Sequence, residues 1–279
     1  MGKLPVGLQV YNLRDILADH PEKFEEVMKA VKGLGYDGVE MAGLYGMAPE
    51  RIRDILDRVG LKAISAHVPL AEMEADAKKV AADYKAIGCD YVAVPFLQDD
   101  YRHYAKGPGY KTALAAMKNA GAVMKDAVMK LLYHNHDFEF VPLPDGRFGF
   151  DDIFEQIPAD LLMVEPDTCW IKVAGQDPVA YINKYEPRCE IVHLKDFIME
   201  GTPKRLYELL GIKGEEAEKK AGFFEFRPVG FGQQIWEPIL DAAAGASAKW
   251  VIVEQDLHYG LGGLEAARRS REYLKILGW

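Results

Sequence analysis

The sequence predicts a single α/β domain of the (β/α)8 TIM barrel type over residues 1–279. Eight short apolar runs of β-type composition alternate with longer segments of helical period, which is the pattern of strand–helix units in a parallel sheet. Most of these units repeat every roughly 25 to 35 residues, and one barrel commonly uses a chain of this length. A doubly wound open sheet usually has fewer strands.

The apolar runs give the expected strands, and the amphipathic segments between them give the expected helices. The expected strands are residues 6–11, 38–41, 62–68, 91–97, 130–136, 161–167, 190–196 and 250–256. The expected helices are residues 21–35, 47–60, 71–88, 110–129, 177–186, 236–246 and 263–277, with a short helix near 151–157. The first of these helices begins with Pro21 and acidic residues and ends at Gly35, as helix start and stop signals predict.

Two segments are longer than ordinary loops. Residues 137–150 alternate around Pro144, Asp145 and Gly146, which predicts a hairpin over the mouth of the barrel. Residues 198–235 contain the charged stretch TPKRLYELLGIKGEEAEKKAG, an expected helix, followed by FRPVGFGQQ. Both segments follow strands and therefore belong to the catalytic face of the barrel. The charged helix fits a solvated surface as well as it fits a lid or a contact in a homo-oligomer.

Composition argues against several classes of partner. The net charge of -9 and the pI near 5.4 disfavour nucleic acid, whose binding depends on neutralising phosphates with Lys and Arg. No stretch reaches the roughly 18 apolar residues of a membrane span, and the start lacks the order of a signal peptide, so we expect a cytoplasmic protein. Cys89, Cys169 and Cys189 form no CxxC pair and are expected to be reduced, buried thiols.

Polar side chains gather at the ends of the last four expected strands. These are His134, Asn135, His136, Glu165, Asp167, His193, Lys195, Asp196, Glu254 and Asp256. Residues two apart in a strand share a face, and the strand ends of a barrel converge, so one member of each pair can enter the mouth. Imidazoles and carboxylates together suit Mn, Zn, Co or Fe better than Ca, with Mg also a candidate. A lone histidine would be a hydrogen-bonded core residue, but four strands in a row predict one divalent metal ion.

The motifs YHNHDFEF, VEPDTCWIKVAGQDP, IVHLKD, PVGFG and IVEQD occur in an order that resembles the sugar phosphate isomerase/epimerase family of xylose isomerase-like barrels. The resemblance covers nearly the whole chain and extends to ketose 3-epimerases, inosose dehydratases and endonuclease IV. It implies metal ligands at His134, Asp167, His193 and Glu254. Many epimerases have Glu at the first position, whereas HNH here resembles the HHH of inosose dehydratases, so either His134 or His136 is the ligand.

The resemblance also implies catalytic and substrate-binding roles. Glu254 is the first candidate for the base, and Glu165 or a histidine is expected to replace the second glutamate of the epimerases. Lys195 points the same way as His193 and could bind a substrate oxygen or stabilise an enolate. The expected substrate-binding residues are Glu40, His67, His136, Trp170 and Lys195. For Glu40, His67 and Trp170 a purely structural role in the core is the alternative, and Asp196 is expected to face a helix instead.

These residues predict a divalent-metal-dependent isomerase or epimerase acting through an enediolate next to the carbonyl of a keto sugar or keto polyol. The alternative is an inosose-dehydratase-like lyase, which shares the same intermediate. A non-catalytic sugar-binding barrel explains the acid–base groups less well. Abasic-site cleavage is disfavoured because Trp170, Phe224 and Phe226 stand where the resemblance to endonuclease IV would require further metal ligands.

Overall fold

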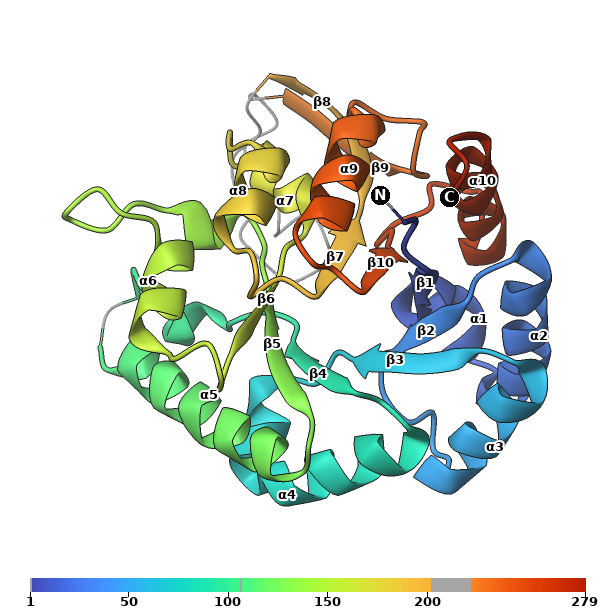
Figure 1. The fold of residues 1–279 in the computed structure, drawn as a ribbon, viewed down its shortest axis with the longest axis horizontal. Helices are drawn as coiled ribbons and strands as arrows, with labels where there is room; N and C mark the ends of the chain where they lie inside the picture. Colours follow the sequence, from blue (N-terminus) through green and yellow to red (C-terminus); the bar gives the residue numbers. More distant parts are fainter. Residues whose placement is uncertain (1, 106, 202–221) are drawn as a thin grey trace.

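The computed structural model describes residues 2–105, 107–201 and 222–279, and within these ranges the chain forms a barrel of eight parallel strands. Each strand lies within one of the expected runs, which confirms the predicted fold class. The barrel strands are β1 (Val6–Gln9), β2 (Gly38–Met41), β3 (Lys62–Ala66), β4 (Tyr91–Val94), β5 (Lys130–His134), β6 (Met163–Glu165), β7 (Ile191–Leu194) and β10 (Trp250–Val253). Figure 1 shows these strands at the centre, with the helices around the outside.

The barrel closes through two seams that carry site residues. Continuous parallel pairing joins β3, β2, β1, β10 and β7 in one run and β4, β5 and β6 in another. Single parallel bridges between His67 and Ala93, and between Asp167 and His193, link the two runs. Three side chains expected at the functional site therefore lie at the two seams.

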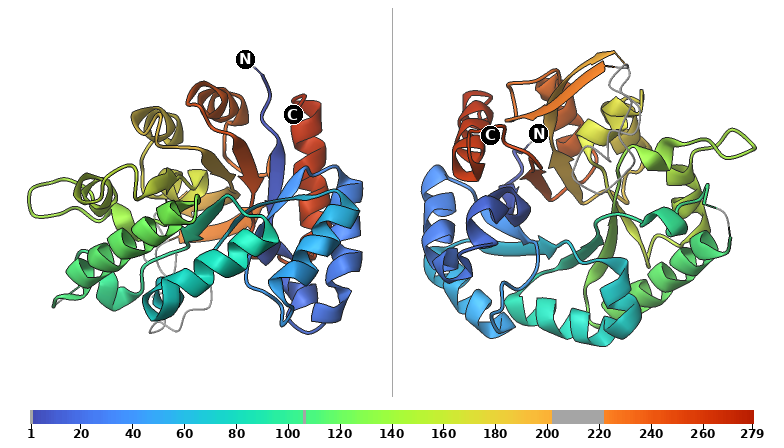
Figure 2. Two further views of the ribbon diagram at one scale, coloured as in Figure 1. Left: turned by 60° about the horizontal axis from the view of Figure 1, so that its bottom comes forward. Right: turned by 180° about the vertical axis from the view of Figure 1, so that it is seen from behind.

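The helices follow the predicted order and form the outer ring seen in both views of Figure 2. They are α1 (Arg14–Leu17), α2 (Phe24–Leu34), α3 (Pro49–Val59), α4 (Leu70–Ile87), α5 (Gly109–Asp126), α6 (Gly149–Gln156), α7 (Thr168–Val173), α8 (Pro178–Lys184), α9 (Trp236–Gly245) and α10 (Gly263–Ile276). Helix α6 is short, as expected, and α2 ends at Gly35 with φ 96°. The short helices α1 and α7 were not predicted. No helix in the described part of the chain is both long and apolar enough to span a membrane.

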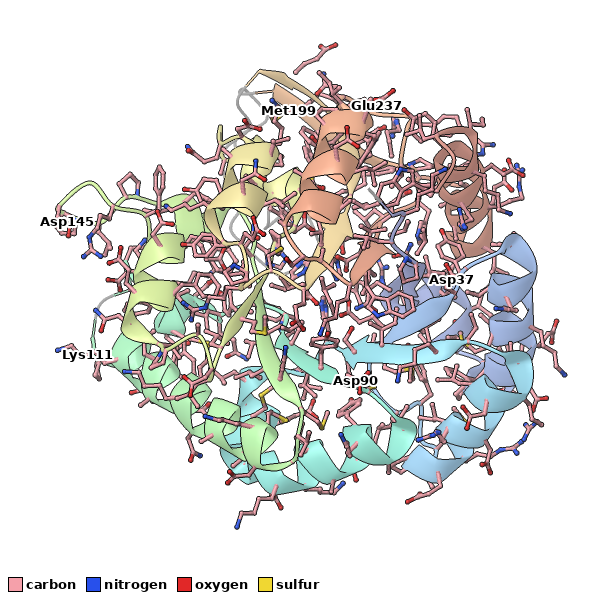
Figure 3. The ribbon with its side chains drawn as sticks, in the orientation of Figure 1. Asp37, Asp90, Lys111, Asp145, Met199 and Glu237 are labelled. Atoms are coloured by element: carbon pink, nitrogen blue, oxygen red, sulfur yellow. The ribbon has the colours of Figure 1, made fainter. Side chains whose placement is uncertain are left out.

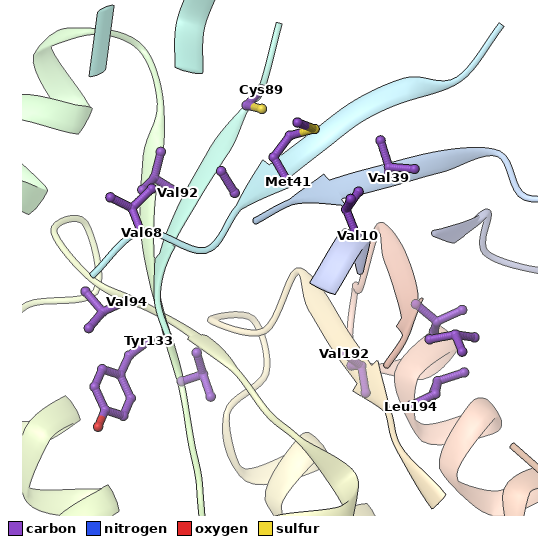
Figure 4. Close-up of a cluster of buried hydrophobic side chains, with 14 of the residues drawn as sticks. Val10, Val39, Met41, Val68, Cys89, Val92, Val94, Tyr133, Val192 and Leu194 are labelled. Carbon is purple, nitrogen blue, oxygen red and sulfur yellow. The ribbon is translucent and has the colours of Figure 1, made fainter. Parts of the chain in front are cut away.

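Apolar side chains fill the barrel interior and the layer between strands and helices. Figure 4 shows part of the outer layer, with Val39, Val92 and Val192 on three different strands. A smaller inner cluster surrounds Ile64, whose side chain fills space next to Gly38. A Cβ atom at Gly38 would lie 2.6 Å from the carbonyl oxygen of Lys62, so only glycine fits there. All three cysteines are buried and free, as predicted.

The segment after β5 forms the predicted hairpin, but this hairpin does not lie over the mouth. It begins with a single 3-10 turn, Phe138–Phe140, and contains one antiparallel bridge between Pro142 and Phe148. Its tip at Asp145 extends outward from the barrel (Figure 3). Phe138 and Phe140 are buried, so their packing anchors the start of the segment and directs the tip away from the mouth.

The segment after β7 forms an antiparallel ribbon that the sequence did not reveal. Strand β8 (Asp196–Gly201) pairs with β9 (Gly222–Arg227), with Phe197 opposite Phe226. The charged helix predicted from the stretch that starts at residue 202 lies outside the described residues. As expected, Asp196 faces away from the mouth, and it accepts a hydrogen bond of 3.0 Å from Nε1 of Trp236 on α9.

The PVGFG motif is explained by the same aspartate. Asp196 also accepts hydrogen bonds from the backbone N–H groups of Gly230 and Gly232, at 2.9 and 3.1 Å. A Cβ atom at Gly232 would overlap the carboxylate, so this residue must be glycine for the loop to approach. The motif is a structural turn that fixes the base of the ribbon.

Candidate metal centre and active-site cavity

A cavity of about 480 Å³ opens at the carboxyl ends of the barrel strands. This volume lies in the range of small-molecule sites in proteins. The wall combines aromatic and aliphatic side chains with histidines and carboxylates, which suits a ligand that has both apolar faces and hydroxyl groups. The lining residues are Tyr11, Arg14, Ala42, Gly43, His67, Pro69, Glu72, Tyr84, Pro95, Phe96, His134, His136, Glu254, Asp256 and Leu257.

Four buried side chains at one side of this cavity form what we call the metal set. The members are His134, Asp167, His193 and Glu254, and one donor atom of each lies within 4.8 Å of the donors of the others. Nε2 of His134 is 3.5 Å from Oδ2 of Asp167, and Nδ1 of His193 is 3.0 Å from Oε2 of Glu254. Two imidazole nitrogens and two carboxylate oxygens at this spacing fit one divalent transition-metal ion.

Asp167 shows why the metal set fits a cation. Its Oδ1 caps helix α7 by accepting hydrogen bonds from the backbone N–H groups of Cys169 and Trp170, at 2.8 and 3.1 Å. Its Oδ2 is buried and accepts no hydrogen bond from the described residues. The ammonium of Lys195 lies 3.0 Å from Oδ2, so this oxygen already faces one positive charge, and a metal ion would supply a second.

Asn135 and Thr168 hold the strands that present the metal set. Oδ1 of Asn135 accepts a hydrogen bond of 2.9 Å from the backbone N–H of Asp167. Oγ1 of Thr168 donates one of 2.9 Å to the backbone carbonyl of His193. These bonds tie β5 to the residues after β6, and those residues to β7. The middle residue of the HNH motif therefore positions a carboxylate on the neighbouring strand.

Lys195 places a buried positive charge among the carboxylates. Its Nζ lies 3.0 Å from Asp167, 2.9 Å from Glu254 and 3.0 Å from Asp256. Burial alone would lower the pKa of Lys195, but the three carboxylates outweigh that effect and hold it well above its ordinary value. Three ionised carboxylates and one ammonium leave two negative charges. A divalent cation would offset that remainder.

A second cluster, which we call the lower set, lies beneath the cavity. It consists of Glu40, His67 and Glu165, and both glutamates are fully buried. Nε2 of His67 lies 2.9 Å from Oε2 of Glu165, in hydrogen-bond geometry, and 3.1 Å from Oε2 of Glu40. Gln9 and Ser65 each donate a side-chain hydrogen bond to Glu40, at 2.7 and 2.5 Å. Neutral donors from β1 and β3 thus satisfy both oxygens of Glu40.

The metal set and the lower set approach opposite nitrogens of the same two imidazoles. His134 has Nδ1 3.3 Å from Glu165 and Nε2 3.5 Å from Asp167. His193 has Nε2 2.9 Å from Glu40 and Nδ1 on the side of the metal set. On the lower side, one donor atom from each of His67, His134, Glu165 and His193 also lies within 4.8 Å of the others. A neutral imidazole offers a lone pair at only one nitrogen, so the two positions are alternatives for one ion.

Burial and neighbouring charges shift several pKa values here. Burial, together with the charge of Glu40, raises the pKa of Glu165 to about 7. Burial raises the pKa of Asp256 to about 6, because the attraction of Lys195 offsets it only in part. Burial lowers the pKa of His136 well below its ordinary value, so its imidazole is neutral at pH 7.

Comparison with known proteins identifies the family. Residues 28–277 match the family model described as a xylose isomerase-like TIM barrel. This chain belongs to the xylose isomerase-like TIM barrel family. The match includes seven of the eight barrel strands and the whole of the metal set and lower set.

Individual members of the family resemble the chain at low identity over its whole length. An inosose dehydratase of Lacticaseibacillus casei is 24% identical over 276 residues, covering 90% of this chain and 88% of that protein. A sugar phosphate isomerase/epimerase from Parabacteroides distasonis has a TM-score of 0.75 and 21% identity, covering 98% of each chain. A xylose isomerase-like protein from Mycobacterium smegmatis, solved in complex with magnesium, has a TM-score of 0.70 and 17% identity, covering 99% of this chain and 98% of that one.

The barrel brings together most of the residues expected from the family resemblance. His134 lies with the metal-set donors, whereas His136 belongs to neither group of candidate ligands in the described structure. The ring of His136 stacks on Phe138 at 5.6 Å and faces the cavity. Trp170, expected at the substrate, is buried behind His136 with ring centroids 5.2 Å apart and does not line the cavity.

Sequence reasoning missed several residues of the site. Arg14 lines the cavity and its guanidinium lies 4.0 Å above the ring of Tyr11, but nothing in its sequence context marks it. Glu139 is buried, accepts a hydrogen bond of 2.8 Å from the backbone N–H of His136 and also bonds Tyr133. A charged residue between two phenylalanines, in the stretch FEF, was the signal that could have revealed it.

Proposed function

We propose that this chain is an enzyme that removes the proton next to the carbonyl of a keto sugar or keto polyol, with one divalent cation as cofactor. The resulting enediolate leads to isomerisation or epimerisation. The observation that carries this proposal is the metal set at one side of the cavity, where one donor atom from each of two imidazoles and two carboxylates lies within 4.8 Å of the others. The names of the relatives, which refer to sugars and polyols, support the substrate class.

His134, Asp167, His193 and Glu254 would hold the cation, which is Mn, Zn, Co, Fe or Mg in this proposal. When bound, it supplies Lewis-acid polarisation of the substrate carbonyl. Glu254 lies at the cavity wall and is the first candidate to take the α proton. Lys195 retains its charge but is buried and does not line the cavity, so its role is to hold Asp167, Glu254 and Asp256 in place.

Three outcomes follow from the same proton removal. Return of the proton to the same carbon from the other face is epimerisation, and its delivery to the neighbouring carbon is isomerisation. Loss of a hydroxyl group from the β carbon is dehydration. Dehydration is the second candidate, because the HNH stretch has two histidines and the L. casei relative is an inosose dehydratase.

Two other functions fit the residues less well. Cleavage of abasic DNA by a trinuclear site would need further ligands, but Phe224 and Phe226 are buried aromatic residues that pack on Trp170. The net charge of -9 also opposes binding to a phosphate backbone. A sugar-binding barrel without turnover would not need a lysine between three carboxylates.

The test is proton exchange on a panel of keto sugars, inososes and oxidised glycosides in deuterated water with added Mn²⁺. The proposal predicts metal-dependent incorporation of deuterium next to the carbonyl of at least one compound. A new stereoisomer or constitutional isomer then indicates an epimerase or isomerase, whereas an enone-like absorbance indicates a dehydratase. Binding of a panel member without any exchange would overturn the proposal.

A further inference from the structure

The buried position of Glu165 separates it from any substrate. Its side chain is fully buried, and it does not line the cavity. Two imidazoles of the cavity wall contact Glu165: His67, at 2.9 Å and with its side chain 11% exposed, and His134, at 3.3 Å. A carboxylate in this position can act on a substrate only through one of these imidazoles.

The backbone and the ring of His67 are both fixed. Its backbone N–H donates to the carbonyl of Met41 at 2.9 Å, and it pairs with Ala93 across the seam between β3 and β4. Its ring packs edge-on against His134 at 4.8 Å between centroids and stacks on His193 at 5.3 Å. His67 therefore stands beside the metal set without belonging to it.

The two nitrogens of His67 have different surroundings. Nε2 lies between Glu165 and Glu40, at 2.9 and 3.1 Å. Nδ1 has no hydrogen-bond partner among residues 2–105, 107–201 and 222–279, and it is not a buried unsatisfied atom. Two carboxylates at Nε2 favour the tautomer in which that nitrogen carries the proton. In the neutral ring the lone pair then resides on Nδ1.

We propose that His67 is a second catalytic residue, besides Glu254, that exchanges a proton with the substrate and that Glu165 and Glu40 are positioning residues that hold its tautomer. The inference rests on the proposed function and gives the lower set a role in it. Nδ1 takes the proton from the carbon next to the carbonyl, the C–H electron pair becomes the C=C bond, and the carbonyl oxygen gains the negative charge. The imidazolium then returns the proton to carbon or gives it to a departing hydroxyl group.

This role requires that no metal ion occupies the lower side, where donor atoms of His67, His134, Glu165 and His193 also lie within 4.8 Å of one another. An ion bound there would take Nε2 of His67 and the oxygens of Glu165, and the tautomer described above would be lost. The arrangement of carboxylate, imidazole and substrate recurs in enzymes that transfer protons. The carboxylate fixes the orientation of the ring and stabilises its charged form. His67 also supplies a second base in the cavity wall, on a different strand from Glu254.

The test compares His67→Gln, Glu165→Gln and the double variant, with His20→Gln as the control at an exposed histidine. The glutamine at position 67 can still donate to Glu165 but has no basic lone pair. The panel described above, with Mn²⁺, supplies the exchange assay. Manganese affinity by calorimetric titration and circular dichroism report binding and folding separately.

We expect His67→Gln to slow deuterium exchange by about 100-fold or more, with manganese affinity within about threefold of the unaltered protein. Glu165→Gln should slow exchange by about tenfold, and the double variant should be no slower than His67→Gln, because groups that act as a unit are not additive. Added imidazole should restore part of the exchange in His67→Ala. The His20→Gln control should match the unaltered protein.

Three results would overturn the relay. The first is undiminished deuterium exchange in folded His67→Gln, and the second is additive effects on exchange in the double variant. The third is loss of manganese binding in both His67→Gln and Glu165→Gln, which would place the ion in the lower set. Absence of exchange by the unaltered protein with every member of the panel would instead overturn the proposed function, and the relay with it.

Discussion

The metal set and the lower set use the same two histidines but neutralise their carboxylates differently. In the lower set, hydrogen bonds from Gln9 and Ser65 satisfy Glu40. In the metal set, Asp167 offers an oxygen without a hydrogen-bond donor in the described structure, and the ammonium of Lys195 is its charged neighbour. Buried atoms without a hydrogen-bond partner in the described structure occur on both sides, since Oε1 of Glu165, Nδ1 of His134 and Nε2 of His193 are among them. The two sets therefore differ in charge, because an ammonium meets three carboxylates at the metal set, whereas neutral donors reach Glu40 in the lower set.

The largest expected effect comes from His193→Ala, because this imidazole serves both sets. We expect loss of bound metal and a fall in turnover on the order of 1,000-fold, while the circular dichroism spectrum stays close to that of the unaltered protein. Metal analysis by mass spectrometry after dialysis and the exchange assay provide the measurements. Near-normal activity in metal-free His193→Ala would show that neither the metal set nor the lower set is needed for turnover.

Lys195→Met tests the charge balance of the metal set. Removal of the ammonium leaves three buried carboxylates without their cation, so we expect the metal-free protein to lose about 3–5 kcal/mol of unfolding free energy. Bound Mn²⁺ should recover part of this loss, since it supplies positive charge to the folded state only. Urea unfolding with and without Mn²⁺ measures both values. An equal loss of unfolding free energy with and without Mn²⁺ would show that Lys195 does not interact with the metal site.

Glu139 is a buried carboxyl that has neutral donors and, within the described part of the chain, no ion pair with a cation. Burial raises its pKa from 4.5 to about 8. The folded protein therefore holds this proton between about pH 4.5 and 8 while the unfolded chain releases it, and stability falls as the pH rises through that window. The slope from this group reaches at most about 1.4 kcal/mol per pH unit.

Glu139→Gln should remove that contribution, because the amide can accept from the backbone of His136 and donate to Tyr133 without titrating. The variant should gain stability relative to the unaltered protein as the pH increases from 5 to 8. Urea unfolding at pH 5, 6.5 and 8 measures the difference. Parallel stability curves for the two proteins would contradict the raised pKa.

The smallest expected effect is that of Asn135→Ala. The side chain of Asn135 accepts a hydrogen bond from the backbone N–H of Asp167, so its loss should weaken manganese binding by about tenfold without changing the number of ions bound. Calorimetric titration gives both quantities. An unchanged affinity would mean that Asp167 is positioned by its helix cap alone.

The fold and the members of the metal set were predictable, because alternation along apolar strands places His134, Asp167, His193 and Glu254 at strand ends that must converge. The orientation of each ring was not predictable, since sequence spacing does not determine which nitrogen of an imidazole faces which carboxylate. For that reason Glu165 was expected at the substrate although it lies behind His67.

Other features were hidden because they depend on contacts between distant residues. The β8–β9 ribbon pairs Phe197 with Phe226, and no local pattern connects two strands separated by a long insertion. Arg14 reaches the cavity by stacking on Tyr11, a contact that its neighbours in the sequence do not specify. Helix α7 begins where Asp167 caps it, yet the same residue was interpreted only as a metal ligand.

The most direct test measures manganese affinity in Asp167→Asn and Glu165→Gln, two matched changes of carboxylate to amide. Each affects one position only, since Asp167 belongs to the metal set and Glu165 to the lower set. We predict that Asp167→Asn weakens binding by about 100-fold or more while Glu165→Gln changes it by less than about tenfold. The reverse order of effects would place the ion beneath the cavity and contradict the assignment of the metal set.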